Sequence, residues 1–282
     1  MRIVYFFYLR IKWSYFYPYL PHERSFMYPL IGIFQCTIPT FGVLFLIGTG
    51  CGFLLAIPTA KKYDITTMDA MFFGLFGIIG GITGAKLLYI LIDLPNLIAS
   101  PETALIRLAT GGAIFYGGLI GGILGGFLYT QVYHLDAVKF FDIAVPCLAL
   151  AQAFGRIGCF FNGCCYGIPY DGPYAVHYPI GAYPPSGVGL FPAQLTESSF
   201  LFILTLVLVI VLNKSQTPGL TTGCYLIASG IFRFINEFFR SDPRGNIGML
   251  STSQFISLII IALGLLFIIK VPQTLYQKHL KD

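Results

Sequence analysis

Charged side chains are scarce in this sequence. Only 10% of the 282 residues are Asp, Glu, Lys or Arg, whereas a soluble domain has nearer 25%. Hydrophobic residues make up 56% of the chain, and the mean hydropathy is +0.77. This balance excludes an ordinary soluble protein and predicts one integral membrane unit rather than several domains.

Runs of basic residues are also missing. The net charge of +5 is spread thinly along the chain, which excludes a nucleic-acid-binding patch and is typical of loop ends that meet anionic lipid. Four of the seven cysteines stand singly in apolar surroundings, and we expect them to be inert core residues. They are Cys36, Cys51, Cys147 and Cys224.

The other three cysteines, Cys159, Cys164 and Cys165, follow the spacing C-x4-C-C. This is a poor zinc pattern, because structural zinc sites favour closely spaced cysteine pairs and four ligands. The chain has no C-x-x-C redox motif. We therefore predict no metal and no cofactor. The alternatives for the cluster are a disulfide, packed thiols, or a reactive thiolate helped by Arg156.

Apolar runs near the ~20 residues that a membrane span requires recur seven times. The fifth run is short and is expected to extend back to Pro192. The sequence therefore predicts an all-α integral membrane protein with about seven transmembrane helices. The runs lie near 38–58, 70–92, 112–133, 138–158, 199–212, 219–238 and 254–271.

Lysines in the loops predict the orientation, because short cytoplasmic loops carry an excess of Lys and Arg. We expect an outside N-terminus and an inside C-terminus. The lysines assigned to the cytoplasmic side are Lys61, Lys62, Lys139, Lys214, Lys270, Lys278 and Lys281. The arginines assigned to the other side are Arg107, Arg240 and Arg244.

Two segments interrupt the pattern of spans. Residues 1–26 are aromatic and carry four basic residues against the predicted orientation. We expect this segment to lie at the interface or to be non-native, with the functional protein beginning at Met27 and 27–282 forming a single domain. The stretch 168–192, with six prolines and four tyrosines, is predicted to form an ordered extracytoplasmic cap.

Glycines recur at four-residue steps in the second and third runs, so that each set lies on one helix face. Such faces allow two helix backbones to touch, or they provide a smooth groove for an acyl chain. Both interpretations stay open. The sets are Gly77/Gly81, Gly80/Gly84, Gly117/Gly121/Gly125 and Gly118/Gly122/Gly126.

Polar chemistry is concentrated between Gly155 and Gly167, directly after an almost uncharged run. Arg156 within this segment is costly in a bilayer unless it faces a cavity, the interface or a partner. Glycines let backbone amides approach a ligand closely. We interpret the segment as a binding site for a lipid head group.

A second polar group lies at the end of the sixth run. Arg233, Glu237 and Arg240 are spaced i, i+4 and i+7, which predicts that they share one helix face. Arg233 either pairs with Glu237 to fix helix packing, or reaches a substrate phosphate while Glu237 holds it in place. The planar fork of arginine suits phosphate, and Arg156 with Arg233 would clamp one phosphodiester.

The fifth run opens with Gln194 and Glu197. Glu197 pairs with an arginine across the bundle, or caps a helix N-terminus. The sequence does not decide between these two roles.

Taken in chain order from about Pro39 to Ile268, the motifs resemble those of prolipoprotein diacylglyceryl transferases, bacterial membrane enzymes that lipidate lipoprotein precursors. Any one motif is weak, whereas five in order are specific. The matching segments are Gly84-Ala85-Lys86-Leu87, Tyr116-Gly117-Gly118-Leu119-Ile120-Gly121-Gly122, Gly155-Arg156-Ile157-Gly158 with Asn162-Gly163 and Gly167, Pro192-Ala193-Gln194-Leu195-Thr196-Glu197, and Phe232-Arg233 with Glu237-Phe238-Phe239-Arg240.

The chain departs from the family pattern at five positions. Tyr116 stands where the family has a histidine, and Cys159 and Cys164 replace an asparagine and a glutamate of the signature. Lys86 replaces an arginine, and Phe41 replaces a tyrosine. The residues expected to bind phosphate are retained, whereas the residue expected to handle the proton is not.

The resemblance implies transfer of the diacylglyceryl group from phosphatidylglycerol to the lipobox cysteine thiol of prolipoproteins, with release of glycerol phosphate. It places this reaction in the bacterial cytoplasmic (inner) membrane, toward the outer leaflet. The alternatives are a non-catalytic phospholipid-binding paralogue and a transferase with another acceptor. The implied catalytic residues are Arg233 and Tyr116, and the implied substrate-binding residues are Arg156, Asn162, Gly167, Glu237, Arg240, Gln194 and Glu197.

Overall fold

The computed structural model describes residues 30–33, 36–99, 114–179, 182, 184–215, 217–242 and 245–279. The predictions for residues 1–26, Arg107 and Arg244 lie outside these residues. The helices are α2 (Thr40–Ala60), α3 (Thr67–Ala99), α5 (Phe115–Val132), α6 (Ala137–Asn162), α7 (Ala193–Lys214), α8 (Leu220–Asn236) and α9 (Thr252–His279), with 3-10 turns η1 (Lys61–Tyr63) and η2 (Glu237–Phe239).

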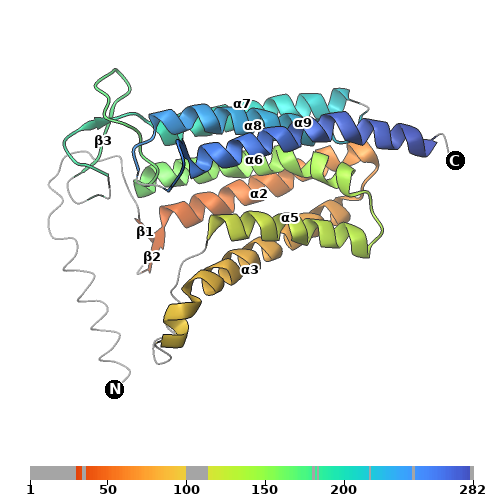
Figure 1. Cartoon of the computed structure of the whole chain (residues 1–282), viewed down its shortest axis with the longest axis horizontal. Helices are drawn as coiled ribbons and strands as arrows, with labels where there is room; N and C mark the ends of the chain where they lie inside the picture. Colours follow the sequence, from red (N-terminus) through yellow and green to blue (C-terminus); the bar gives the residue numbers. More distant parts are fainter. Residues whose placement is uncertain are drawn as a thin grey trace.

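Three short antiparallel hairpins complete the described part. They lie at one end of the helices, where β1, β2 and β3 are labelled in Figure 1. Their strands are β1 (Leu30–Ile33) with β2 (Cys36–Pro39), β3 (Val176–His177) with β4 (Gly189–Leu190), and β5 (Asn246–Ile247) with β6 (Leu250–Ser251).

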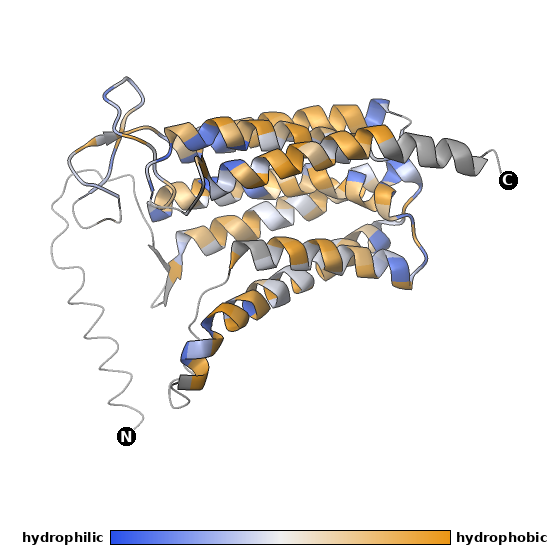
Figure 2. Cartoon of the chain, viewed as in Figure 1, coloured by the Kyte–Doolittle hydropathy of each residue, from blue (hydrophilic) through white to orange (hydrophobic). Residues whose placement is uncertain are grey.

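The helices form an elongated bundle (Figure 1). Helix α6 packs against α2 and α7, α8 packs against α9, and α3 pairs with α5 beside them. Apolar residues occupy the middle of the helices, and hydrophilic residues gather mainly at the two ends (Figure 2). This division is what a bilayer imposes, because apolar surface faces the lipid tails and polar groups face the interfaces.

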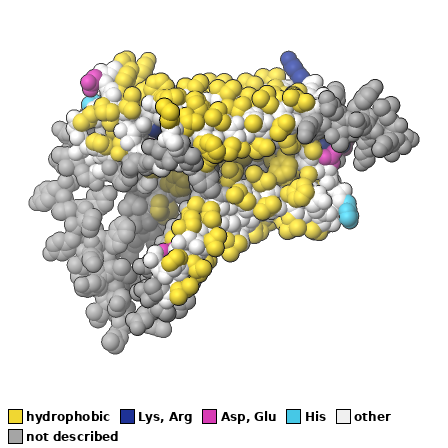
Figure 3. Space-filling view, in the orientation of Figure 1, with side chains coloured by type: hydrophobic (Ala, Val, Ile, Leu, Met, Phe, Trp, Pro, Cys, Tyr) yellow, Lys and Arg dark blue, Asp and Glu magenta, His cyan; other side chains and the backbone are white. Residues whose placement is uncertain are grey.

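Membrane character is confirmed by helix length and by the exposed surface. Five described helices, α2, α3, α6, α7 and α9, are long and apolar enough to cross a membrane, while α5 and α8 are shorter. Large hydrophobic side chains are exposed along them and cover much of the visible face (Figure 3). The number of spans and the orientation of the termini stay predictions.

Two helix boundaries affect the site. Helix α7 begins at Ala193, as expected for a fifth run that extends back to Pro192. Helix α6 continues to Asn162 and is closed by Gly163 at φ 73°, four residues beyond the predicted span. Arg156 and Cys159 are therefore helical residues, and only the stretch from Gly163 onward is a loop.

The two ends of the bundle differ in their polar groups. At one end, Lys62 Nζ donates a hydrogen bond to the carbonyl oxygen of Asn213 at 3.2 Å, which ties η1 to the end of α7. The segment 168–192, predicted to be an ordered cap, lies at the other end and contains the β3–β4 pair (Figure 1). The loop lysines Lys61, Lys62, Lys139 and Lys214 thus lie away from this segment.

A buried carboxylate fixes the lysine-rich end. Asp142 of α6 is fully buried and accepts hydrogen bonds from the backbone N–H groups of Gly219 (2.6 Å) and Thr222 (2.8 Å). The hydroxyls of Thr222 (2.7 Å) and Tyr63 (3.0 Å) also donate to it. Asp142 therefore caps the N-terminus of α8 from a neighbouring helix, where the helix dipole favours negative charge.

The glycine faces of α3 and α5 bring two backbones together. A Cβ atom on Gly80 would collide with the carbonyl oxygen of Gly121, and one on Gly84 would collide with that of Gly117. Gly125 has the same relation to the carbonyl oxygen of Phe76. The tight-packing interpretation is therefore confirmed for the face that carries Gly80 and Gly84.

We expect Gly121→Ala to destabilise the protein by about 1–3 kcal/mol, because the added methyl group forces the α3 and α5 backbones apart. Thermal unfolding of the purified protein in detergent measures this as a lower Tm. Gly50→Ala in α2 is the matched control, since a Cβ atom there meets nothing within 4 Å. Equal Tm values for the two variants would contradict the assigned packing.

Candidate active site

Glu197 lies at the centre of the polar groups at the cap end of the bundle. Its Oε1 atom is 3.1 Å from Arg156 Nη2, and its Oε2 atom is 3.4 Å from Arg233 Nη1. The three side chains come from α7, α6 and α8 respectively. The two arginines that the sequence singled out therefore converge, and Glu197 takes the role of pairing across the bundle.

Arg233 makes further contacts on its other side. Its Nη2 atom is 3.4 Å from Glu237 Oε2 and donates a hydrogen bond to Ser253 Oγ at 3.2 Å. Glu237 Oε1 in turn accepts a hydrogen bond from Ser251 Oγ at 3.0 Å. The predicted Arg233–Glu237 pair is thus present, and the hydrogen bond to Ser253 joins α8 to the start of α9.

Exposure shows which of these groups a ligand reaches. The side chains of Arg156 and Arg233 are each 24% exposed, whereas that of Glu197 is 10% exposed. A guanidinium has five N–H donors, more than the contacts above occupy. Both arginines can therefore donate to a bound anion while they keep contact with the protein.

The prediction that Arg240 shares a helix face with Arg233 and Glu237 is wrong. Helix α8 ends at Asn236, the next residues form η2, and Arg240 is extended at φ −108° and ψ 143°. The backbone of Arg240 forms a β-bridge with Gly167 instead of continuing the helix. Its buried guanidinium makes a two-point contact with Asp242, with both distances 3.2 Å.

Gly167 has a structural role in this arrangement. A Cβ atom at this position would collide with the carbonyl oxygen of Phe191 and would lie 2.9 Å from that of Phe239. Only glycine allows the backbone to pass between them. The adjacent hydrogen bond from Ile168 N–H to the Phe239 carbonyl (3.0 Å) keeps Arg240 beside the loop.

Gln194 holds the cap segment against the bundle. The buried Nε2 group of Gln194 donates to the Cys164 carbonyl at 2.8 Å and to the Tyr178 hydroxyl at 3.1 Å. Burial raises the pKa of Tyr178 to about 12, so this hydroxyl is neutral. Asn162, the exposed last residue of α6, hydrogen-bonds to the Cys164 side chain. The contacts of Gln194 and Asn162 thus fix the loop rather than form part of the Arg–Glu cluster.

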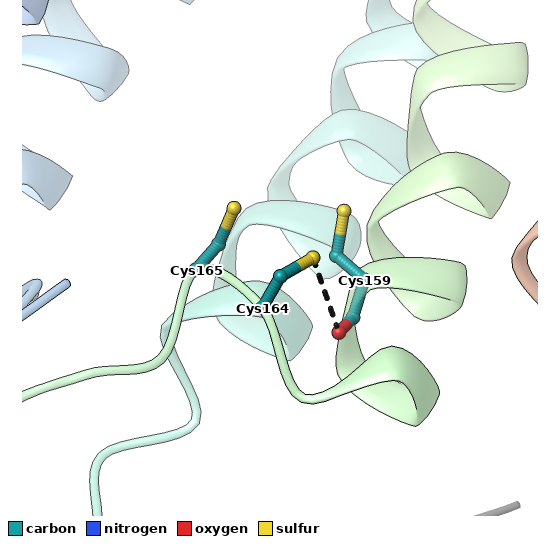
Figure 4. Close-up of side chains that lie close together, drawn as sticks. All are labelled: Cys159, Cys164 and Cys165. Atoms are coloured by element: carbon teal, nitrogen blue, oxygen red, sulfur yellow. Dashed lines mark hydrogen bonds between the residues drawn. The ribbon is translucent and has the colours of Figure 1, made fainter. Parts of the chain in front are cut away.

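The three clustered cysteines lie next to Arg156. Their sulfur atoms are all within 4.8 Å of one another (Figure 4), and all three cysteines are free, so the disulfide alternative is not the one observed. Arg156 Nη1 lies 3.8 Å from Cys165 Sγ. Hydrogen bonds with Cys159 and Cys164 lower the pKa of the Cys165 thiol, and the guanidinium groups of Arg240 and Arg156 lower it further.

A cavity of about 300 Å³ opens beside Glu237 and Arg240, although neither Arg156 nor Arg233 is among its lining residues. Its lining combines charged groups with Phe238 and the fully exposed Met249. Charged groups next to exposed apolar groups suit an amphipathic ligand. The lining residues are Glu237, Phe238, Arg240, Asp242, Met249, Ser251 and Gln254.

Tyr116, the second predicted catalytic residue, lies in the first turn of α5. Its side chain is outside the part of the chain that the structure describes. Its catalytic role stays a prediction.

Sequence reasoning missed several residues of the site. Asn236 Nδ2 donates to Glu197 Oε2 at 3.4 Å. The sequence could have indicated this residue, because Asn236 lies three residues after Arg233 and residues at this spacing share a helix face. Ser251 comes from the end of β6, Ser253 comes from the start of α9, and Tyr178 comes from the cap segment. No local sequence pattern indicates these three, because each reaches the site through tertiary packing.

Comparison with known proteins decides the family. A family described as "Prolipoprotein diacylglyceryl transferase" matches residues 29–270, a range that includes the arginine–glutamate cluster and the cysteines. The chain belongs to this family. The resemblance seen in the motifs is thereby confirmed.

Individual members of the diacylglyceryl transferase family match over most of their length. The "Phosphatidylglycerol--prolipoprotein diacylglyceryl transferase" of Clostridium tetani is 40% identical over 84% of this chain and 94% of its own. The Clostridium perfringens protein, which bears the same name with the number 2, is 37% identical over 83% and 91%. The Mannheimia succiniciproducens transferase is 32% identical over 81% and 87%.

We expect Glu197→Gln to destabilise this transferase by about 2–3 kcal/mol, because two mostly buried guanidinium groups would lose their shared carboxylate. The lower Tm is measured by thermal unfolding in detergent. Asp136→Asn is the control, because its ion pair with Lys139 is exposed and asparagine is an equally good helix N-cap. A Tm for Glu197→Gln as high as that of the control would contradict the central place of Glu197.

Proposed function

We propose that this protein transfers the diacylglyceryl group of phosphatidylglycerol to the lipobox cysteine thiol of a prolipoprotein and releases glycerol phosphate. The observation that carries the proposal is the convergence of Arg156 and Arg233 on Glu197, at 3.1 and 3.4 Å, in a member of the diacylglyceryl transferase family. Relatives that match most of the chain are named for the same substrates.

The two arginines would hold the phosphodiester of the lipid. Arg156 and Arg233 have more N–H donors than Glu197 and Glu237 occupy, so the phosphate would bind to the donors that remain. Charge grows on the phosphate as the glycerol C3–O bond breaks, and two preorganised guanidinium groups stabilise that charge. Glu237 and Ser253 fix the direction of Arg233 during this step.

The difference between the two ends of the bundle supports an orientation in the membrane. The loop lysines lie at the end opposite the arginine cluster, and basic loops remain cytoplasmic. We therefore place the active site toward the outer leaflet of the bacterial inner membrane, with α2, α3 and α5–α9 as seven spans. The exposed apolar side chains of Phe238 and Met249 at the cavity would receive the lipid sideways from the bilayer.

The acceptor thiol has to lose its proton before it attacks glycerol C3. A cysteine with an ordinary pKa of about 8.5 is only a few per cent ionised at neutral pH. Tyrosine, with a pKa near 10, is a poor general base. We therefore assign Tyr116 a positioning role at the start of α5.

Arg233→Lys and Arg156→Lys should each lower kcat/KM about 100-fold, because lysine cannot make the two-point contact with phosphate. The assay incubates purified protein with labelled phosphatidylglycerol and a lipobox peptide, and quantifies diacylglyceryl cysteine by mass spectrometry. Lys139→Ala, at the opposite end of the bundle, should keep the wild-type rate. Unchanged rates in both arginine variants would refute the phosphate clamp.

The same assay separates the alternative functions, together with complementation of a cell depleted of its lipoprotein transferase. Phosphatidylglycerol binding without transfer indicates a non-catalytic paralogue. Label that enters another molecule of a cell extract indicates another acceptor. Growth of the depleted cell supports the proposal, and failure of both growth and peptide lipidation refutes it.

Tyr116→Phe tests the assignment of Tyr116. A rate within about twofold of wild type is expected if the side chain only positions substrate. The pH profile of kcat should keep its shape, because no titrating group is removed. A loss of activity that rises steeply at low pH would instead assign Tyr116 to proton transfer.

A further inference from the structure

The cysteines beside the arginine cluster form an unusual local structure. Cys159 lies in the last turn of α6, and Cys164 and Cys165 lie on the turn that follows. The three sulfur atoms lie within 4.8 Å of one another (Figure 4). The phosphate-binding step proposed above uses none of these sulfur atoms.

Backbone geometry holds the sulfurs together at a cost. Gly163 and Cys165 both have left-handed backbones, with φ 73° and 63°. For a residue with a side chain this conformation costs about 1–3 kcal/mol, and such strain is concentrated at ligand-binding sites. The Gln194 hydrogen bond to the Cys164 carbonyl and the bond from Cys164 N–H to the Cys159 carbonyl (3.2 Å) keep the turn in place.

We propose that Cys159, Cys164 and Cys165 bind one zinc ion through three thiolates and leave a fourth coordination position open. Tetrahedral zinc with Zn–S bonds of about 2.3 Å places sulfur atoms about 3.8 Å apart. The observed separations of at most 4.8 Å need only a small rotation of the side chains to close. Three protein ligands and an open position are the arrangement of catalytic zinc rather than structural zinc.

The charges around the sulfurs suit a divalent ion. Three thiolates and one Zn²⁺ carry a net charge of −1. Arg156, with Nη1 at 3.8 Å from Cys165 Sγ, offsets this charge, and the guanidinium of Arg240 adds a second positive charge near the same sulfur. Such outer contacts orient thiolate ligands and compensate the charge of the centre.

The open position would take a thiol. Zinc deprotonates a coordinated thiol outright, and soft sulfur ligands suit this ion. This step rests on the proposed function, in which the acceptor is a cysteine thiol and Tyr116 is a poor base. The thiol would bind as thiolate and release its proton to solvent. Its sulfur would then bond to glycerol C3, while the C3–O bond breaks and glycerol phosphate leaves with the electron pair.

The first test is a titration of the full-length, reduced, metal-free protein in detergent with Co²⁺, the spectroscopic stand-in for zinc. We expect about one equivalent to bind, with sulfur-to-cobalt charge-transfer absorption and the intense visible bands of tetrahedral cobalt. Zinc should displace it. Serine at any of the three positions should weaken binding about 10-fold or more, whereas Cys51→Ser in α2 should not. Absence of the charge-transfer band in wild type would overturn the site.

The second test needs no variant and therefore does not depend on the folding of serine mutants. In zinc-loaded protein, iodoacetamide should spare these three thiols until a chelator is added. Protection that a reductant alone removes would show a disulfide, and immediate alkylation would show unliganded thiols. Either result overturns the proposal.

The third test separates the zinc site from the transfer reaction. Metal binding is measured without lipid or peptide, so its result does not depend on whether the protein transfers a diacylglyceryl group. Where transfer is found, removal of zinc should lower kcat at neutral pH and shift its profile toward higher pH. The same kcat and the same pH profile with and without zinc would overturn the proposed role of the open coordination position in transfer.

Discussion

One carboxylate, Glu197, determines how the cap end of this bundle is arranged. Arg156 on α6 and Arg233 on α8 would repel each other if they converged unaided, and each is costly within a membrane unless it is paired. By contacting both, Glu197 on α7 makes their convergence stable. The contacts that assemble the candidate active site therefore also join α6, α7 and α8 at the cap end, in addition to the apolar core that packs these helices.

The shared carboxylate also has a consequence for turnover. The lipid phosphodiester carries one negative charge, whereas released glycerol phosphate carries nearly two. Two unopposed arginines would bind the product more tightly than the substrate. In the proposed clamp, the negative charges of Glu197 and Glu237 lie against the same two guanidinium groups, so they weaken the binding of this product and favour its release.

Much of this structure could be predicted from local sequence, and the rest depends on packing. Hydrophobic runs located the helices, and the cost of membrane arginine indicated that Arg156 and Arg233 need partners. The position of Arg240 was predicted wrongly, because η2 ends the helical path and a β-bridge to Gly167 replaces it. The cysteines looked unsuited to metal by spacing alone, whereas the left-handed backbone of Cys165 brings their sulfurs together.

Helix α8 is held at both ends by buried carboxylates of other helices, and this explains how a short helix can place Arg233. Asp142 accepts hydrogen bonds from Thr222 near its start, and Glu197 contacts Arg233 eleven residues later. Eleven residues of α-helix span about 16 Å, and the rigid helix keeps the two contacts at this separation. In lipid, apolar contacts alone do not fix how far one helix slides along another. The position of Arg233 along the bundle is therefore determined jointly by the contact with Asp142 at the lysine-rich end and by the contact with Glu197 at the cap end.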